Sequence, residues 1–351
     1  MRGEMYNKAK PALVTGGCGF VGRALTRRLL REGYRLWIVD DCSIGIHCDQ
    51  WLPSSGSRRQ PAAGVVEYED GRVVFVKADA REFFSRRVEF GDLKEPEFGD
   101  VFHLAAVVGG RLVIDGNPLA VAIDLALDAL CFNWAVSSKP DRLLYASSSA
   151  AYPVDLQGAN GAVALKETDI EFGGRIGQPD MTYGWSKLTG EYLARISHKH
   201  YGLHTACVRP FSGYGEEQDL TYPVPSIALR AAKRESPLTV WGSGLQGRDF
   251  VHIDDCVEAM LRVIAIVSDG SAVNIGSGRL INFREVAQLF ATLEGYKVQV
   301  KPLEDKPVGV HSRYADISRM KSLLKWQPEI SVEEGFSRVL KTAHERKNKG
   351  L

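Results

Sequence analysis

Two side chains that could carry acid–base chemistry, Tyr183 and Lys187, lie four residues apart in a segment whose apolar spacing predicts a helix over 183–201. Residues at i and i+4 share a helix face, so the lysine ammonium is expected beside the phenol. A neighbouring cation stabilises the phenolate and lowers the pKa of the tyrosine toward neutrality, which makes Tyr183 a candidate general base. An ordinary aromatic and cation pair on a solvated helix is the alternative.

A run of three serines, Ser147 to Ser149, directly follows the apolar segment 142–146, which predicts a strand. Side chains at the carboxyl end of such a strand lie where open α/β sheets bind ligands. A hydroxyl there can donate to, and accept from, an oxygen that changes between alcohol and ketone. Simple turn chemistry is the competing interpretation of the serine cluster.

A glycine turn near the start of the chain, with Gly16, Gly19 and Gly22, follows a predicted strand and precedes a predicted helix. Glycine permits the tight turn and close approach of the backbone to a pyrophosphate, which the helix N-terminus then attracts. Asp40 ends the next strand, where a carboxylate can accept both ribose hydroxyls. No arginine replaces it to meet a 2′-phosphate, and Asp41 is also acidic, so the sequence predicts NAD rather than NADP. A solvated turn cap is the alternative role for Asp41.

The elements that must position these residues alternate between strand and helix up to residue 210. Strands are expected at 11–15, 35–39, 73–76, 100–104, 142–146 and 205–209, and helices at 21–32, 119–136 and 183–201. This alternation predicts the α/β class, with a Rossmann-type doubly wound parallel sheet. Residues 54–71, rich in Ser, Arg, Pro, Ala and Gly, are expected to form a surface insertion.

Beyond residue 210 the pattern is mixed. Helices are expected at 222–234, 255–267, 283–293 and 317–324, and strands at 238–240 and 298–300. We therefore expect an NAD-binding Rossmann domain over 1–210, to which segments at about 240–280 return. Residues 211–351 are expected to form mainly a smaller, discontinuous α/β substrate domain.

Composition excludes several functional classes. The 351 residues carry 44 basic and 43 acidic side chains, a net charge of +1, so no overall field would gather nucleic acid or an anionic membrane. We expect a cytoplasmic protein, because no signal segment or bilayer-spanning apolar run is evident. The six cysteines show no metal-ligand spacing, so buried free thiols and no metal are expected: Cys18, Cys42, Cys48, Cys131, Cys207 and Cys256.

Several motifs occur in a recognisable order. They are the glycine turn, Asp79, His103-Leu-Ala-Ala106, the serine run, Tyr183-Gly-Trp-Ser-Lys187, Arg209-Pro210-Phe211 and the segment 247–255. Together they resemble the extended short-chain dehydrogenase/reductases, within the group of nucleotide-sugar epimerases and dehydratases. The resemblance covers nearly the whole chain. Within that group, the chain is similar to the UDP-galactose 4-epimerases and the GDP-mannose 3,5-epimerases.

The resemblance implies roles residue by residue. The implied catalytic residues are Ser148, Tyr183 and Lys187, with Ser149 as the alternative hydroxyl. The implied cofactor-binding residues are Gly16, Gly19, Phe20, Val21, Gly22, Asp40, Asp41, Ser43, Asp79, Ala80, Leu104, Ala105, Ala106, Ser147, Tyr183, Lys187 and Pro210. The implied substrate-binding residues are Gly110, Arg111, Ser148, Ser149, Phe211, Ser212, Val224, Trp241, Arg248 and Arg313. Of these, Arg248 and Arg313 would meet the diphosphate of a nucleotide sugar.

Departures from the family pattern narrow the expected reaction. Sugar 4,6-dehydratases carry an acidic pair beside the catalytic hydroxyl, where this chain has Ser149 and Ala150. The 3,5-epimerases carry a cysteine where Ala150 stands, which makes double epimerisation less favoured. Asp124 occupies a helix position where relatives usually have asparagine.

The sequence therefore predicts an NAD-dependent nucleotide-sugar epimerase that oxidises a sugar hydroxyl transiently to a ketone. Its partners are expected to be a nucleotide-diphosphate sugar and, by family analogy, a second copy of the chain in a homodimer. The alternatives are an NAD(P)-dependent reductase, a 4,6-dehydratase, or a non-catalytic dinucleotide-binding sensor. No residue distinguishes UDP, GDP and TDP sugars.

Overall fold

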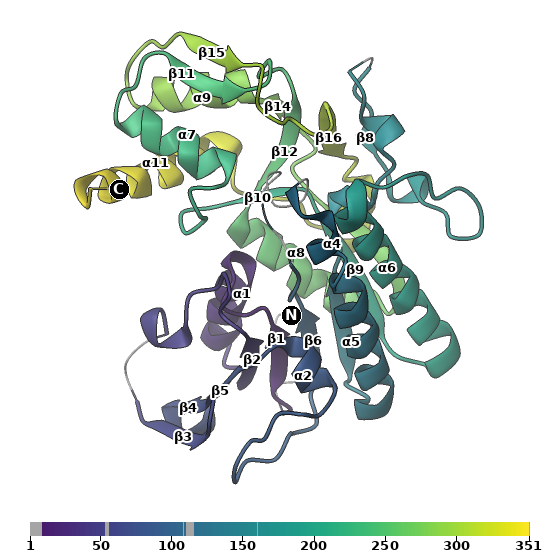
Figure 1. The fold of residues 1–351 in the computed structure, drawn as a ribbon. Helices are drawn as coiled ribbons and strands as arrows, with labels where there is room; N and C mark the ends of the chain where they lie inside the picture. The colour runs from purple at the N-terminus through teal and green to yellow at the C-terminus, as the bar shows by residue number, and fades with distance from the viewer. Residues whose placement is uncertain (1–8, 53–55, 108, 110–115, 160, 351) are drawn as a thin grey trace.

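A nine-stranded sheet forms the centre of the computed structural model, which describes residues 9–52, 56–107, 109, 116–159 and 161–350 (Figure 1). From one edge to the other its strands are β13 (Asp269–Ile275), β9 (Thr205–Pro210), β7 (Arg142–Ala146), β6 (Asp100–His103), β1 (Ala12–Thr15), β2 (Leu36–Asp40), β5 (Val73–Lys77), β4 (Val65–Tyr68) and β3 (Arg58–Ala62). Neighbours from β13 to β5 are parallel, and β4 and β3 are antiparallel. The strand order reverses between β1 and β6, the place where doubly wound sheets bind ligands.

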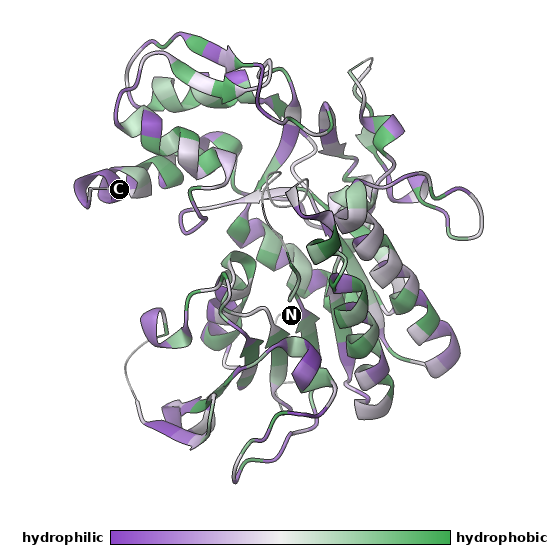
Figure 2. Ribbon diagram, viewed as in Figure 1, coloured by the Kyte–Doolittle hydropathy of each residue, from purple (hydrophilic) through white to green (hydrophobic). Residues whose placement is uncertain are grey.

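Helices cover both faces of this sheet. Helices α1 (Phe20–Arg31), α8 (Ile253–Ile266) and α10 (Ser318–Leu324) supply one apolar core with the strands. On the other face, α2 (Ala80–Phe84), α5 (Asp124–Ser138) and α6 (Met181–Tyr201) supply a second core. Hydrophobic residues, green in Figure 2, line the central strands and the helices beside them. A parallel sheet must be buried on both faces, and helices cover both faces of this one. The predicted α/β class is therefore confirmed.

A smaller second unit is built from later segments. One sheet contains β10 (Ser212–Tyr214), β12 (Gly247–His252), β16 (Ser312–Ala315), β8 (Ala164–Leu165) and β14 (Leu280–Asn282). A two-stranded sheet pairs β11 (Leu238–Trp241) with β15 (Val300–Leu303). Helices α7 (Pro223–Ala232), α9 (Phe283–Leu293) and α11 (Val332–Asn348) pack around a third core. Figure 1 shows the green α8 lying against the purple α1, so a late segment returns to the first unit.

Three local expectations differ from the structure. The expected insertion at 54–71 contains the β3–β4 hairpin, which extends the sheet instead of forming a separate loop. The helix expected over 119–136 is two helices, α4 (Pro118–Val121) and α5, separated at residues 122–123. The strand expected over 298–300 is observed as β15, at Val300–Leu303.

The stretch Pro118–Ser138 is long and apolar enough to cross a membrane, judged by length and composition alone, with a mean hydropathy of 1.7. It contains two buried carboxylates, Asp124 and Asp128, and packs against α2 and α6. Its apolar character therefore has an explanation within the fold, because one face contributes to the core while Leu119 and Leu125 are exposed on another.

Candidate active site

The glycine turn between β1 and α1 forms the floor of the candidate cofactor site. Gly16 has φ +69°, and a Cβ there would lie 2.7 Å from the Ala105 backbone nitrogen. A Cβ on Gly22 would lie 2.1 Å from the Gly16 carbonyl oxygen. Gly19 is the N-cap of α1 and supplies no side-chain cap, so the first N–H groups, at Phe20 and Val21, lack intrahelical partners. The turn thus has the close packing and unpaired donors that a pyrophosphate requires.

Asp40 lies at the end of β2, beside this turn. Its two carboxylate oxygens accept hydrogen bonds from the backbone nitrogens of Cys18 (2.9 Å) and Cys42 (2.8 Å). Burial raises the pKa of Asp40 above its ordinary value. The Asp41 side chain is exposed and accepts from the Ser43 backbone nitrogen at 2.9 Å. The structure therefore places Asp40 against the turn and gives Asp41 the role of a local cap.

Two further segments with predicted cofactor residues follow the carboxyl ends of β5 and β6. Asp79 caps α2, beginning at Ala80, and its carboxylate is held by Arg81 at 2.5 Å, which lowers the pKa of Asp79. The segment 104–106 follows β6, and the Ala105 nitrogen lies 3.3 Å from the Thr15 hydroxyl. The Ala105 backbone packs against Gly16 at the β1–β6 switch point, whereas Asp79 follows β5, which is separated from β1 by β2.

Tyr183 and Lys187 lie in the first two turns of α6, as their spacing predicted. The Lys187 ammonium lies 5.8 Å from the centroid of the Tyr183 ring and 5.2 Å from that of Tyr145. Burial opposes the charge of Lys187, but Asp128, Tyr183 and Asp124 outweigh it and raise the pKa of Lys187 above its ordinary value. The lysine therefore stays protonated beside the phenol at neutral pH.

The three serines have different environments. Ser147 is buried, and its hydroxyl donates to the Glu191 carboxylate at 2.5 Å. Ser148 is half-buried, and its hydroxyl accepts a 3.1 Å hydrogen bond from the Ala150 nitrogen. Ser149 is buried, with 6% of its surface exposed. Of the three, only the Ser148 side chain combines partial exposure with a position at the end of β7.

Carboxylates that sequence reasoning had not singled out lie beneath this site. Asp128, on α5, accepts from the Tyr145 hydroxyl at 2.5 Å and lies 3.1 Å from His103 Nε2. Glu191 lies four residues, about one helical turn, beyond Lys187 on α6. Its Oε2 atom forms a buried ion pair with Arg209 Nη2 at 2.7 Å. The i+4 spacing from Tyr183 through Lys187 to Glu191 was a usable signal for their shared face.

Asp124 lies completely buried at the start of α5. One carboxylate oxygen accepts from the Val107 nitrogen at 2.7 Å, and the other has no hydrogen-bond partner among the residues that the structure describes. Burial raises the pKa of Asp124 to about 6, although the charge of Lys187 opposes that rise. A titratable group with spare hydrogen-bonding capacity thus lies near Lys187.

The predicted diphosphate arginines are neighbours across two strands. Arg248 on β12 and Arg313 on β16 are register partners in a parallel pair. Arg313 also forms an ion pair with Asp180 (2.8 Å) and donates to the Gln157 side chain (2.5 Å), while Arg248 donates to the Gly247 carbonyl (2.7 Å). The pairing brings both guanidinium groups to one region, with Arg313 held by Asp180.

The remaining predicted substrate residues differ in how far their side chains are exposed. Phe211 is buried against Tyr152, Ser212 is half-buried in β10, and Trp241 is 40% exposed at the end of β11. Val224, at the start of α7, is 2% exposed and packs into the core of the second unit, so its side chain is not available to a ligand. The predicted Gly110 and Arg111 lie outside the described residues. Pro210 ends β9, half-buried, near the serine loop.

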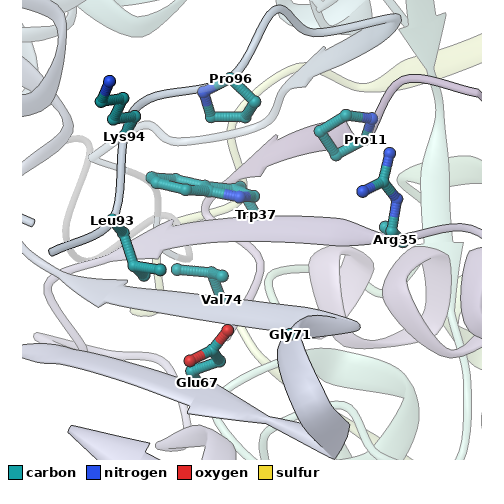
Figure 3. Close-up of a pocket in the computed structure, with 9 residues that line it drawn as sticks. All are labelled: Pro11, Arg35, Trp37, Glu67, Gly71, Val74, Leu93, Lys94 and Pro96. Carbon is teal, nitrogen blue, oxygen red and sulfur yellow. The ribbon is translucent and has the colours of Figure 1, made fainter. Parts of the chain in front are cut away.

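Two hollows on the surface lie at the amino ends of the parallel strands, opposite the carboxyl ends that carry the candidate site. The first, shown in Figure 3, is bordered by Pro11, Arg35 and Gly71, which precede β1, β2 and β5. The second is bordered by Asp141 and His204, which precede β7 and β9. Both lie at the amino ends of parallel strands, whereas the glycine turn and the serines lie at the carboxyl ends, so neither hollow belongs to the candidate site.

Comparison with known proteins agrees with this geometry. Residues 12–276 match the model of the NAD dependent epimerase/dehydratase family. The chain belongs to that family. GDP-mannose 3,5-epimerase of Arabidopsis thaliana is 29% identical over 332 residues, which cover 92% of this chain and 79% of that protein.

Solved structures show the same fold. A UDP-glucose 4-epimerase of Thermotoga maritima with UDP-glucose has a TM-score of 0.77 at 24% identity, covering 97% of this chain and 99% of that one. A dTDP-glucose 4,6-dehydratase of Streptomyces venezuelae with NAD also has a TM-score of 0.77, at 22% identity, covering 97% and 98%. The family assignment confirms the predicted cofactor, NAD, and the glycine turn and Asp40 fit it.

Replacement of Asp124 by asparagine tests the burial of this carboxyl group. Because the folded pKa is about 6, above the ordinary value, Asp124 favours folding while protonated, and this contribution is lost as pH rises through about 6. Asp124→Asn stays neutral and is expected to be more stable than the native chain by about 2–3 kcal/mol above pH 7, with no gain near pH 4. Chemical unfolding at several pH values measures the difference.

Asp128→Asn is the matched control for this experiment. Both oxygens of Asp128 have close polar neighbours, His103 and the Tyr145 hydroxyl, so its replacement is expected to destabilise the fold throughout that range. An Asp124→Asn protein that is less stable than the native chain at pH 8 would contradict the inference about Asp124.

Proposed function

We propose that the protein is a nucleotide-sugar epimerase that oxidises a ring hydroxyl to a ketone and then reduces it from the other face. The observation that carries this proposal is the serine loop beside the Tyr183 and Lys187 pair. Positions 147–150 are Ser-Ser-Ser-Ala, and Ser148 and Ser149 offer hydroxyls but no carboxyl group for protonating a leaving hydroxyl. The loop therefore favours epimerisation over loss of water.

The residues of the chain have distinct tasks in this reaction. Bound NAD supplies a hydride acceptor that can return the hydride to the ring. Tyr183 takes the proton of the sugar hydroxyl, and the buried Lys187 ammonium stabilises its phenolate. Ser148 hydrogen-bonds the reacting oxygen as it becomes a carbonyl. Tyr183 returns the proton to the oxygen when the ketone is reduced, which restores the hydroxyl, and the return of the hydride leaves no net change in the cofactor.

The second unit supports the choice of a diphosphate-bearing substrate. Arg248 and Arg313 are register partners on β12 and β16, which provides two cationic groups on adjacent strands. Tyr222 lies at the N-cap of α7. Burial is the main cause that raises the pKa of Tyr222, and the nearby Tyr183 phenol is the second cause. This proximity brings the second unit against the catalytic helix, where a nucleotide sugar would bridge the two units.

Incubation with UDP-, GDP- and dTDP-sugars, without added NADH, tests the proposed reaction. We expect an epimer to accumulate by NMR with no net consumption of cofactor, and Tyr183→Phe to lower kcat by about 10²-fold or more because the base is lost. A keto-deoxy product would identify a dehydratase, and stoichiometric use of NADH a reductase. NAD binding without turnover of any such sugar would identify a sensor, and full turnover by Tyr183→Phe would refute the role of this residue.

Separate alanine variants distinguish the two candidate hydroxyls. Ser148→Ala is expected to lower kcat by about 10²-fold, since a hydrogen bond to the developing oxyanion is lost. Ser149→Ala is expected to change kcat far less, because its side chain is buried beside Ala150. Comparison of kcat and KM for both variants provides the measurement, and a larger loss in Ser149→Ala would reverse the assignment.

A second copy of this chain is the proposed occupant of the apolar face on α4, α5 and α6. These helices carry exposed apolar side chains, including Leu119 (81% exposed), Leu125 (40%) and Trp185 (44%). Leu125→Glu is expected to convert a dimer into a species of one chain mass, 38.7 kDa, in light scattering. Ile266→Glu, at an exposed apolar site on α8, is the control and should leave the mass unchanged. A native protein of one chain mass would contradict the dimer.

A further inference from the structure

Three of the six cysteines converge at the ribose end of the cofactor site, although Cys18 is remote in sequence from the other two. Cys18 belongs to the glycine turn, Cys42 follows β2, and Cys48 begins a short 3-10 helix, Cys48–Gln50. The Sγ atoms of Cys18 and Cys48 are 3.6 Å apart, and both residues are 0% exposed. Cys42 is partly exposed and so provides access from solvent.

The Asp40 carboxylate completes this group. Ligand atoms of Cys18, Asp40 and Cys42 all lie within 4.8 Å of one another. The carboxylate is fixed there because its oxygens accept the backbone N–H groups of Cys18 and Cys42. Cys42 has φ +57°, in the left-handed region, a conformation that few residue types adopt readily. Two sulfurs and one oxygen therefore converge from two segments, with a third sulfur beside Cys18.

These separations suit a tetrahedral thiophilic cation. With zinc–sulfur bonds of about 2.3 Å, two sulfurs on one tetrahedral ion are about 3.8 Å apart. The 3.6 Å between Cys18 and Cys48 is close to that value, and the 4.8 Å limit for the Cys18, Asp40 and Cys42 atoms requires only small side-chain movements. Sulfur with a carboxylate oxygen is a donor set that zinc accepts.

We propose that Cys18, Cys42 and Asp40 form a site for a thiophilic divalent cation such as Zn²⁺, and that the cation competes with NAD for Asp40. On binding, the two thiols release their protons to solvent and form zinc–sulfur bonds, so no oxidant takes part. Cys48 or a water molecule supplies the fourth ligand. The competition rests on the ribose role of Asp40, whereas cation binding itself does not depend on the proposed epimerase reaction.

Titration of the full-length, NAD-free protein with Zn²⁺ and with Co²⁺, under a phosphine reductant, tests this site. We expect one equivalent of Zn²⁺ in the native mass spectrum, and a near-ultraviolet thiolate-to-cobalt absorption with Co²⁺. Zn²⁺ at about ten times its dissociation constant should weaken NAD binding by roughly tenfold, by mass action. NAD affinity is measured first without metal, which keeps failure of the cofactor site distinguishable from failure of the cation site.

Matched cysteine variants assign the ligands. Cys42→Ser is expected to lower Zn²⁺ affinity at least about tenfold, because even partners outside the ligand shell typically change affinity by that factor. Cys256→Ala, which removes a buried thiol from the α8 core, is the control and should bind Zn²⁺ like the native chain. Absence of the thiolate–cobalt absorption in the native protein, equal Zn²⁺ binding by Cys42→Ser, or NAD affinity independent of Zn²⁺ would each overturn the proposal.

Discussion

The buried ion pair between Glu191 and Arg209 holds helix α6 against strand β9 of the central sheet. Glu191 accepts two hydrogen bonds from the Arg209 guanidinium (2.8 and 2.7 Å), and a third from the Ser147 hydroxyl. Both charged side chains are 1% exposed, so removal of either would leave an uncompensated charge in the core, an unfavourable change of about 3–5 kcal/mol. Because α6 carries Tyr183 and Ser147 immediately precedes Ser148, this pair fixes the proposed base, Tyr183, relative to the Ser148 hydroxyl. Arg209 further donates to the Tyr152 hydroxyl, which in turn donates to Asn274 on β13.

Much of the first unit could be predicted because its determinants are local. The glycine turn needs closeness that only glycine allows, and the four-residue spacing of Tyr183 and Lys187 needs only a helix. The β3–β4 hairpin was missed because the polar segment 58–62 is an exposed edge strand, without the apolar alternation of a buried one. Helix α11 was also missed, although Ser331 caps it and its apolar face completes the core of the second unit.

The site was less predictable wherever its properties arise from long-range contact. Asp128 comes near Lys187 only when α5 packs on α6, and nothing in its sequence neighbourhood marks it. The ion pair of Arg313 with Asp180 joins residues far apart in the chain, so sequence alone could assign Arg313 to a phosphate but could not see this second partner. The Val224 side chain lies in the core of the second unit, a placement that depends on the packing of α7 and that the local sequence does not indicate.

Buried carboxylates near the candidate site are satisfied by the fold to different degrees. Glu191 and Asp128 have polar partners at both oxygens, which is how a buried charge is ordinarily tolerated. Asp124 differs, because one of its oxygens has no hydrogen-bond partner among the described residues, and burial raises its pKa against the opposing charge of the nearby Lys187. A hydroxyl donor placed against that oxygen would complete the hydrogen bonding that the described residues leave incomplete.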